Sequence, residues 1–356
     1  MVSVQVIGAG PSGSVAALSA LMHNHNVSVY EEHQRAGTPV NCSGLISKEG
    51  LESLKDFVDY KKHAKNRMRG AIIDCAGTKL FVDSRKDIAY VIDRASFDSA
   101  LAQKAEAEGA KFHYGKRVSP PFPEGHIIGA DGPNSLVASH FNFPRISRFV
   151  GVSQSTVKYD GTMPDHVRVF LSNKNFPGFF AWLIPQNEEY AEVGAGCVLP
   201  GNPNNSLDLL SKHIGIDSPT EKTHSIIPVA CREKTFLLSG SRNVLLVGDA
   251  AGHVKSTTGG GVVFGTQCAR LAGQHIEFPQ QYETKCREIH GRDLDAHYHL
   301  HTALGKMSDD SLRALGSLAS AFRIEDFLQK DGNMDRPMRM LGPNLLLHPF
   351  RALMNK

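Results

Sequence analysis

The chain has 356 residues, of which 41% are hydrophobic and 21% are charged, and its formal net charge is +3. This is the composition of an ordinary globular protein, long enough for two domains or for one large core with an appendage. The small net charge, without a run of Lys and Arg, excludes general nucleic-acid binding, so we expect no DNA or RNA partner. Six scattered cysteines without a Cys-x-x-Cys pair exclude a zinc ribbon, an iron–sulfur ligand set and a disulfide framework.

The expected location is the cytoplasm. The first predicted strand starts at residue 2, with no charged leader and apolar run before it, so we expect no signal peptide. No uninterrupted apolar stretch reaches the length of a membrane span.

A glycine-rich segment near the start, Val6-Ile-Gly-Ala-Gly-Pro-Ser-Gly13, is typical of a dinucleotide-binding turn. A lone Gly-x-Gly-x-x-Gly is a weak signal, but here an apolar strand is predicted over 2–7 and a small-residue helix over 12–21. A second strand, 27–31, follows and ends in Glu31. This order of strand, turn, helix, strand and acid predicts a Rossmann-type unit.

The residues of this turn have separate expected roles. Gly8 allows the tight turn, Gly10 lets the backbone approach a pyrophosphate, and Gly13 lets helix and strand pack closely. Ser12 lies in the same turn, where the helix N-terminus offers amides and a partial positive charge to phosphates. The carboxylate of Glu31 is placed to accept hydrogen bonds from both hydroxyls of an adenosine ribose, and it would repel a 2′-phosphate.

The segments that follow this unit are predicted to contain a loop, short strands and a helix. We expect a long loop up to about residue 70, then two short strands, 71–74 and 79–82, forming a hairpin around Gly77. The nucleotide-fold pattern then returns with further strands and a helix, namely 90–94, the helix 95–108, 110–114 and 126–130.

From about residue 147 to 238 the pattern changes to strands with few helices. The expected strands are 149–157, 166–171, 179–184, 192–198 and 224–228, interrupted by one helix, 206–214. This pattern predicts a sheet inserted into the nucleotide-binding domain.

A second glycine-rich segment, after a strand predicted over 243–247, indicates flavin rather than nicotinamide. Asp249 would bind a sugar-like hydroxyl at the end of this strand. Gly259, Gly260 and Gly261, followed by Val262, open another helix, whose free amides can face the electron-rich pyrimidine edge of a reduced flavin. The two segments together predict FAD.

The predicted fold is therefore α/β (α+β), with an FAD-binding Rossmann-type domain, an inserted antiparallel sheet domain and a helical C-terminal part. We assign 1–70, 90–146 and 239–278 to a discontinuous FAD-binding domain. The substrate-binding sheet domain comprises 71–89 and 147–238, and 279–356 form the C-terminal helical segment and tail.

The combined motifs resemble the geranylgeranyl reductase family of flavoproteins, in order and over roughly residues 2 to 315. Besides the two glycine segments, the residues that carry the resemblance are Pro39 to Gly44, Asp93-Arg94-x-x-Phe97-Asp98, Ala130-Asp131-Gly132-x-Asn134-Ser135 and Pro177-x-x-Phe180-x-Trp182-x-Ile184-Pro185. The resemblance implies the fold of the aromatic hydroxylases. Archaeal members, the digeranylgeranylglycerophospholipid reductases, saturate the isoprenoid chains of membrane lipids, and plant and bacterial relatives act on chlorophyll precursors or quinone side chains.

The resemblance also implies site residues. The FAD contacts that carry over are Ser12, Glu31, Cys42, Ser43, Arg94, Val118, Asp249, Gly261 and Val262. Cys42 and Gly44 match the family's cysteine loop beside the flavin ring. Two interpretations of Cys42 stay open, a buried small hydrophobe and a catalytic thiol with a direct part in redox or proton chemistry.

This chain departs from the family in three places. Phe180-Ala-Trp182-Leu-Ile184-Pro185 stands where the family has Tyr-x-Trp-x-Phe-Pro, so the phenol hydroxyl is missing, and the segment is also similar to a flavin-halogenase signature. Only 116–125 connect two strands between which relatives carry a β-meander, so we expect most of the meander to be deleted. Ser256 stands where a proline is common.

The function implied is alkene reduction by FAD-dependent oxidoreduction on CH-CH groups. A proton would go to the less substituted carbon and hydride from flavin N5 to the developing cation, in a site that excludes water. Phe176, Phe179, Phe180 and Trp182 are expected to line the prenyl channel and stabilise positive charge. The electron donor stays open among ferredoxin, a deazaflavin and NAD(P)H.

Two other classes of function stay open, a flavin monooxygenase or halogenase and a noncatalytic or electron-transfer flavoprotein. For the tail after residue 335, rich in Leu and Arg, we weigh peripheral contact with the inner face of a membrane against packing on the protein. We expect no metal site, because only His297 and His301 of the histidines 297, 299 and 301 share a helix face.

Overall fold

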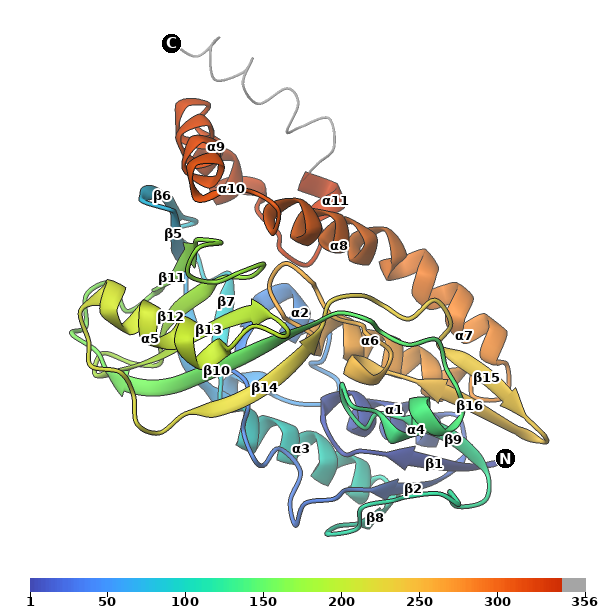
Figure 1. Ribbon diagram of the computed structural model, residues 1–356. Helices are drawn as coiled ribbons and strands as arrows, with labels where there is room; N and C mark the ends of the chain where they lie inside the picture. Colours follow the sequence, from blue (N-terminus) through green and yellow to red (C-terminus); the bar gives the residue numbers. More distant parts are fainter. Residues whose placement is uncertain (341–356) are drawn as a thin grey trace.

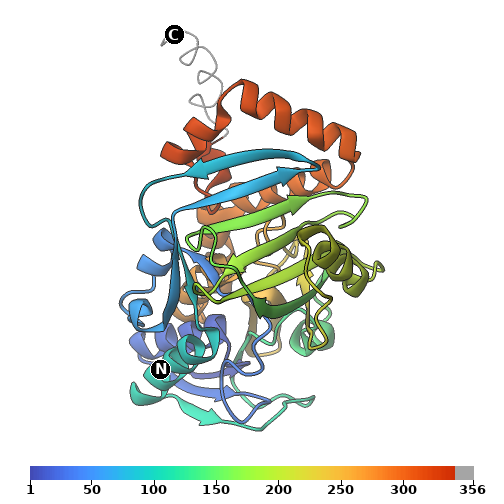
Figure 2. The same cartoon turned by 90° about the vertical axis from the view of Figure 1, so that its left-hand side faces the viewer.

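The computed structural model describes residues 1–340, in which two large sheets and a small third one are joined by helices. Figures 1 and 2 show the sheet that contains residues 3–7 below the sheet that contains residues 149–158, with the helices of residues 309–331 at the top. The predicted fold class is confirmed, since a Rossmann-type sheet is joined to a largely antiparallel sheet and a helical C-terminal part.

The first sheet has six strands in the order β15-β16-β9-β1-β2-β8, and all neighbours are parallel except β15 and β16. Its strands are β1 (Ser3–Ile7), β2 (Asn26–Tyr30), β8 (Lys111–His113), β9 (His126–Gly129), β15 (Phe236–Ser239) and β16 (Arg242–Leu246). The apolar residues of the inner strands are fully buried, as a parallel sheet covered on both faces requires.

Three helices pack together beside this sheet. They are α1 (Pro11–Met22), α3 (Arg94–Ala107) and α6 (Val262–Gln274), and α1 contacts both others. The close approach of α1 and α6 depends on small residues, because a Cβ on Gly273 would lie 2.5 Å from the Ala16 carbonyl oxygen. Helix α6 thus brings the second glycine segment next to the first.

The second sheet has seven strands in the order β14-β10-β13-β12-β11-β5-β6, antiparallel throughout except for the pair β11 and β5. Its strands are β5 (Gly70–Cys75), β6 (Thr78–Asp83), β10 (Phe149–Lys158), β11 (His166–Leu171), β12 (Ala181–Pro185), β13 (Tyr190–Val198) and β14 (Thr223–Pro228). Helix α5 (Pro203–Ile214) packs on β10, β12 and β13. Along β12, Ala181 and Leu183 pack in a core with Leu207 and Leu210 of α5, whereas Trp182 and Ile184 belong to a separate core on the other face.

Part of the expected loop before residue 70 is ordered, which the sequence analysis missed. It contains β3 (Leu45–Ser47), helix α2 (Lys48–Glu52), a short 3₁₀ turn η1 (Tyr60–His63) and β4 (Ala64–Met68). Strands β3 and β4 pair with the two edges of β7 (Ala89–Ile92) to form a three-stranded sheet. Strands this short, one of them alternating with Lys, Asn and Arg, give almost no hydrophobic period.

The connection between β8 and β9 contains no strand, so the predicted loss of the meander is confirmed. The expected hairpin around Gly77 is also confirmed as β5 and β6. After β9, Ser135 caps the short helix α4 (Leu136–His140) by accepting a hydrogen bond from the Ala138 amide.

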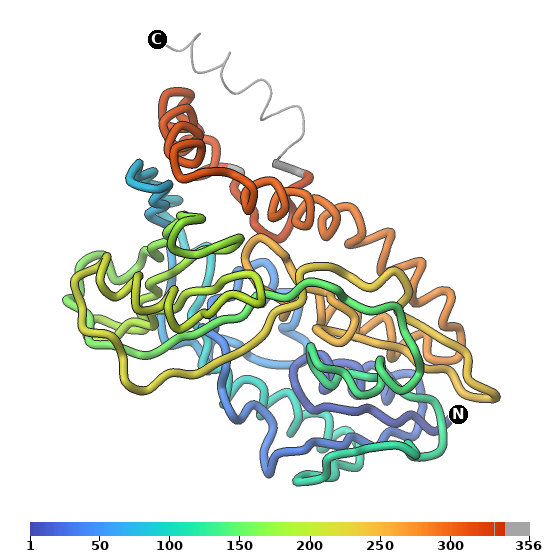
Figure 3. The backbone as a smooth tube through the Cα atoms, viewed as in Figure 1, coloured from blue at the N-terminus to red at the C-terminus, as the bar shows by residue number. Residues whose placement is uncertain are grey.

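The C-terminal helices form a layer that spans both large sheets. Figure 3 shows them running from α7, beside the first sheet, to α9 and α10, above the second. They are α7 (Pro279–Cys286), the π-helical turn η3 (Arg287–Gly291), α8 (Arg292–Leu304), α9 (Asp309–Ala321), α10 (Ile324–Asp331) and α11 (Pro337–Met340). No helix among residues 1–340 is long and apolar enough to cross a membrane. Most of the Leu-rich tail lies outside the described residues.

Candidate active site

A cavity of about 1880 Å³ lies where the first sheet, the second sheet and the C-terminal helices meet. Its lining comes from both glycine segments, from the cysteine loop, from the inner face of the second sheet and from α8 and α10. It therefore joins most of the residues that the sequence predicted as cofactor and substrate contacts.

The three glycines of the first turn lie in two different environments. A Cβ on Gly8, whose φ is +100°, would lie 2.3 Å from the Ala130 carbonyl oxygen, and one on Gly13 would lie 1.9 Å from the Gly8 oxygen. At both glycines the main chain packs directly against another main-chain segment, so a side chain has no room. Gly10 is different, since it lines the cavity and a Cβ there would meet no atom within 4 Å. The backbone at Gly10 is thus open to a ligand.

The carboxylate of Glu31 is held at the cavity by main-chain groups. Its Oε2 accepts a hydrogen bond from the Ala9 amide (2.9 Å), and its Oε1 accepts one from the His33 amide (3.0 Å). Nδ1 of His33 lies 2.7 Å from the same Oε1. An ionised carboxylate has about four acceptor positions, so Glu31 is fixed in orientation and can still accept from sugar hydroxyls.

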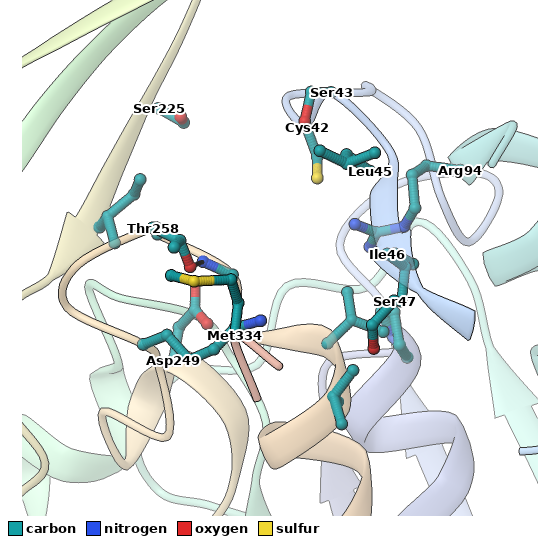
Figure 4. Close-up of a pocket in the computed structure, with 18 of the residues that line it drawn as sticks. Cys42, Ser43, Leu45, Ile46, Ser47, Arg94, Ser225, Asp249, Thr258 and Met334 are labelled. Atoms are coloured by element: carbon teal, nitrogen blue, oxygen red, sulfur yellow. Dashed lines mark hydrogen bonds between the residues drawn. The ribbon is translucent and has the colours of Figure 1, made fainter. Parts of the chain in front are cut away.

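On one side of the pocket in Figure 4 lie Cys42 and Arg94. The Arg94 guanidinium donates two hydrogen bonds to Asp98, at 2.9 and 2.8 Å. Burial lowers the pKa of Arg94, but Asp98 and the neighbouring Cys42 raise it more, so this group stays charged. Cys42 and Ser43 line the cavity, whereas Gly44 lies against the Ile92 carbonyl and acts by packing.

The second glycine segment lies on the opposite side of the same pocket (Figure 4). Burial raises the pKa of Asp249 to about 6, against the opposing effect of Arg94. Within residues 1–340 its carboxylate has no hydrogen-bond partner, so it is free to accept from a polyol hydroxyl. Gly261 is the N-cap of α6 and supplies no side-chain cap, which leaves the first amides of the helix for a ligand. Gly259, Gly260 and Val262 also line the cavity, as does Val118.

These features fit a dinucleotide such as FAD. An open backbone at Gly10, an oriented acid at Glu31, an unpartnered acid at Asp249 and an uncapped helix N-terminus are acceptors and donors of the kind that pyrophosphate, ribose and ribityl hydroxyls need. All of these groups line the same cavity.

The apolar end of the cavity is lined by Phe179, Phe180 and Trp182. The ring centroids of Phe179 and Phe180 are 4.3 Å apart, and those of Phe180 and Trp182 are 5.6 Å apart. The Trp182 indole lies against Gly194, where a Cβ would be only 2.3 Å from the ring. This end is a continuous aromatic wall.

The prediction for Phe176 is wrong. Its side chain is buried in the core with Leu183, Leu207 and Leu210, on the α5 side of the sheet, and it does not line the cavity. The residue precedes β12 in a turn that directs it to the opposite face, and turn geometry of this kind has no period in the sequence.

The sequence analysis also missed buried polar residues near the site. Trp182 donates a hydrogen bond to Glu192 (3.3 Å), and burial raises the pKa of this carboxyl to about 7. The sequence signal for this buried carboxyl was a single acid among the mostly small and apolar residues of β13. Lys255 lines the cavity and pairs with Asp335, for which no local pattern exists.

The histidines of α8 are also explained by packing. His297 is fully buried with Nδ1 2.6 Å from Thr257 Oγ1. Burial lowers the pKa of both His297 and His301. In the part of the chain that the structure describes, no group of three or more His, Cys, Asp and Glu side chains could hold a metal ion.

Comparison with known proteins agrees with this geometry. Residues 6–44 match the NAD(P)-binding Rossmann-like domain family. A digeranylgeranylglycerophospholipid reductase of Methanothrix thermoacetophila is 27% identical over 389 residues, covering 96% of this chain and 97% of that protein. The chain is thus similar to the geranylgeranyl reductase-like family, at about 26% identity over about 90% of its length. An uncharacterized relative from Methanocaldococcus jannaschii is 28% identical and covers 94% of this chain and 92% of its own length.

Solved structures share the fold of this chain. A geranylgeranyl bacteriochlorophyll reductase-like protein from Thermoplasma acidophilum superimposes with a TM-score of 0.79 at 23% identity, covering 90% of this chain and 91% of that one. PqsL of Pseudomonas aeruginosa, described as a probable FAD-dependent monooxygenase, has a TM-score of 0.68 at 13% identity, with coverages of 89% and 99%. The family and its structural neighbours are flavin-dependent oxidoreductases.

Proposed function

We propose that this protein is an FAD-dependent reductase that saturates C=C bonds in geranylgeranyl chains, in the first place those of membrane lipids. The observation that carries the proposal is a single cavity with two chemically different ends. Backbone amides and carboxylates at one end suit a dinucleotide, and an aromatic wall at the other suits an isoprenoid chain. The relatives named digeranylgeranylglycerophospholipid reductases support this substrate class.

The residues proposed to hold FAD fall into two groups. Gly8, Gly13 and Gly44 shape the backbone, and the others present groups to the cofactor. The second group comprises Gly10, Ser12, Glu31, Cys42, Ser43, Arg94, Val118, Asp249, Gly259, Gly260, Gly261 and Val262. When bound, FAD supplies the hydride for the reduction.

The protein's own contribution is to protonate the alkene and shield it from water. An isolated trisubstituted double bond accepts hydride poorly, so a proton is added to its less substituted carbon, and positive charge develops on the more substituted carbon until the hydride arrives. The faces of Phe179, Phe180 and Trp182 attract such a cation and exclude water from it.

Cys42 is the residue proposed to deliver the proton, because its thiol lines the cavity and points into the pocket (Figure 4). Cys42→Ala is expected to lower turnover per bound flavin at least tenfold while the protein still binds FAD. Cys75→Ala, at a buried thiol of the second sheet outside the cavity lining, is the matched control. Full turnover by Cys42→Ala would remove the thiol from the mechanism.

A second candidate function is flavin-dependent oxygenation or halogenation. It is favoured by the fold shared with PqsL and with the flavin-dependent brominase Bmp2, whose TM-score is 0.66 at 15% identity. Such an enzyme would oxidise NAD(P)H with consumption of oxygen, whereas a prenyl reductase turns over without it.

We also propose that the protein takes its substrate at a membrane surface. Leu315, Leu318 and Phe322 of α9 and its end are 42%, 53% and 42% exposed. These residues belong to the C-terminal layer, and α10, the helix that follows α9, lines the cavity. The double variant Leu318→Ser/Phe322→Ser is expected to float less with liposomes than the wild type. Leu238→Ser, at an exposed leucine of the distant strand β15, should float unchanged, and equal flotation of all three would refute the proposal.

Product analysis tests the main proposal. The protein is incubated without oxygen with dithionite and a geranylgeranyl glycerolipid, and the lipid is examined by mass spectrometry. A gain of two mass units per reduced bond is expected. Unchanged lipid, together with oxygen-dependent oxidation of NAD(P)H, would favour the second candidate. Which electron donor acts in the cell, ferredoxin, a deazaflavin or NAD(P)H, can then be assayed on the same lipid.

A further inference from the structure

Lys255 is a buried cation in the turn that leads to the glycine triplet. Its amide donates to the Gly260 carbonyl (3.1 Å), and its own carbonyl accepts from the amides of Thr258 (3.1 Å) and Gly259 (2.8 Å). The side chain folds back over this turn, because a Cβ on Gly260 would lie 2.8 Å from Lys255 Cε and 3.2 Å from Nζ. Its ammonium group therefore lies against the triplet that we assign to the flavin.

The counter-ion of Lys255 comes from the far end of the chain. Asp335, whose side chain is 6% exposed, lies in the connection between α10 and α11, and its Oδ1 is 2.5 Å from Lys255 Nζ. Its Oδ2 accepts a hydrogen bond from Ser47 at the end of β3. One carboxylate thus joins the glycine loop, the sheet beside the cysteine loop and the C-terminal layer.

This connection, residues 332–336, and the first residue of α11 line part of the cavity. Gly332, Asn333, Met334 and Pro337 line it, and Met334 is among the lining side chains drawn in Figure 4. Asn333 donates to Glu49 of α2 (2.7 Å), and Arg336 pairs with Glu49 at 3.4 Å. The connection is therefore fixed to the rest of the site by charged and polar side chains, of which Asp335 is the most buried.

Stability alone is a poor explanation for such a pair. Burying two ions costs desolvation that their attraction often fails to exceed, so apolar residues of similar size usually serve as well. The position of the pair, at the cavity and against the triplet, points instead to electrostatics at the ligand.

We propose that Lys255 stabilises the negative charge of reduced flavin, and that Asp335 limits this effect as a counter-ion. The inference rests on the proposed function, because it requires FAD at the glycine triplet. Two-electron reduction with uptake of one proton adds one negative charge to the ring system. A cation near the pyrimidine edge favours the reduced form, and a carboxylate beside that cation offsets it. Asp335 thereby keeps the reduced cofactor a strong hydride donor.

The test measures the reduced-to-oxidised ratio of bound FAD against a reference dye without oxygen. Lys255→Met is expected to lower the equilibrium constant for reduction about tenfold, a shift of about −30 mV for a two-electron couple. Asp335→Asn is expected to raise it about tenfold, by about +30 mV. Lys255→Arg should stay within about twofold of the wild type, because it keeps the charge. Ser47→Ala, which removes an uncharged contact of Asp335, should also stay within about twofold.

The opposite signs are decisive, since both single variants break the same ion pair. A merely structural latch would shift both variants in one direction or change only their melting temperatures, and either result would overturn the inference. If Lys255→Met does not fold, Asp335→Asn alone still decides, because an unchanged or lowered ratio contradicts the proposal. A wild-type protein that binds no flavin would refute the proposed function itself.

Discussion

The end of the cavity assigned to the cofactor and the end assigned to the substrate are formed by different kinds of chemical group. The end assigned to the cofactor is shaped by close-packed backbone, which leaves no room for side chains at Gly8 and Gly13, and it adds the carboxylates of Glu31 and Asp249. The end assigned to the substrate is made by side chains of one sheet face, among them Phe180 and Trp182. A backbone site tolerates almost no substitution, whereas an apolar wall tolerates exchange of one large side chain for another.

Substitutions in the first glycine turn are expected to have the largest effects. Substituting Gly13 should reduce both stability and FAD affinity, whereas substituting Gly10 should reduce FAD affinity alone. Gly13→Val places atoms within bonding distance of the Gly8 carbonyl, so we expect loss of more than 100-fold in FAD affinity together with several kcal/mol of stability. Gly10→Val has open space and an ordinary φ of −64°. The Gly10→Val variant should have the melting temperature of the wild type, but it should bind FAD at least tenfold more weakly.

Flavin fluorescence titration and thermal melting of the cofactor-free proteins separate these two outcomes. Full FAD affinity in Gly10→Val would show that the pyrophosphate does not lie on this turn.

The apolar end can be tested with two aromatic residues on opposite faces of the second sheet. Phe176→Ala should cost about 3–5 kcal/mol of stability, as for other buried Phe residues, with little change in the KM for a geranylgeranyl lipid. Trp182→Ala should raise that KM about tenfold or more, because it removes the wall of the channel while Gly194 beneath it leaves a gap. The measurement is steady-state kinetics beside urea unfolding. An unchanged KM in Trp182→Ala would move the substrate elsewhere in the cavity.

A smaller effect is expected from the acid behind the aromatic wall. The pKa of Glu192 is raised from 4.5 to about 7 by burial, so between these pH values the folded protein binds more protons than the unfolded chain. Its contribution to stability therefore falls as the pH rises from about 4.5 to about 7. Glu192→Gln keeps an acceptor for the Trp182 indole and has no charge to bury.

We expect the Glu192→Gln variant to be more stable than the wild type by about 1–2 kcal/mol at pH 8 and nearly equal to it at pH 4.5. Urea unfolding at both pH values measures this difference. A stability gap that does not change with pH would show that the pKa of Glu192 is not raised in the folded protein.

The sequence predicted well what depends on local backbone geometry and strongly periodic segments. The turn from β1 to α1, the acid after β2 and the glycine triplet before α6 each have a required residue at a required place, and the structure brings them to one cavity. The resemblance to geranylgeranyl reductases drew on the same residues. Because few other residues can adopt these conformations, the pattern is readable without coordinates.

What the sequence did not predict depends on contacts between distant segments. The sheet of β3, β7 and β4 is made of strands too short to show a period. Phe176 could not be separated from Phe179 and Phe180, because the sequence does not give the direction of a turn. The pair of Lys255 and Asp335 joins residues 80 positions apart that carry no local signal. Such pairs become visible only when the tertiary fold is known.

The central claim is that one cavity holds reduced FAD next to an isoprenoid chain. The most direct test is a single turnover without oxygen, in which dithionite-reduced protein, freed of excess reductant, is mixed with a geranylgeranyl glycerolipid while the flavin absorbance is followed. The account predicts reoxidation of the flavin, with one saturated bond in the lipid for each flavin reoxidised. A flavin that stays reduced with this lipid and reoxidises only when oxygen is admitted would contradict it.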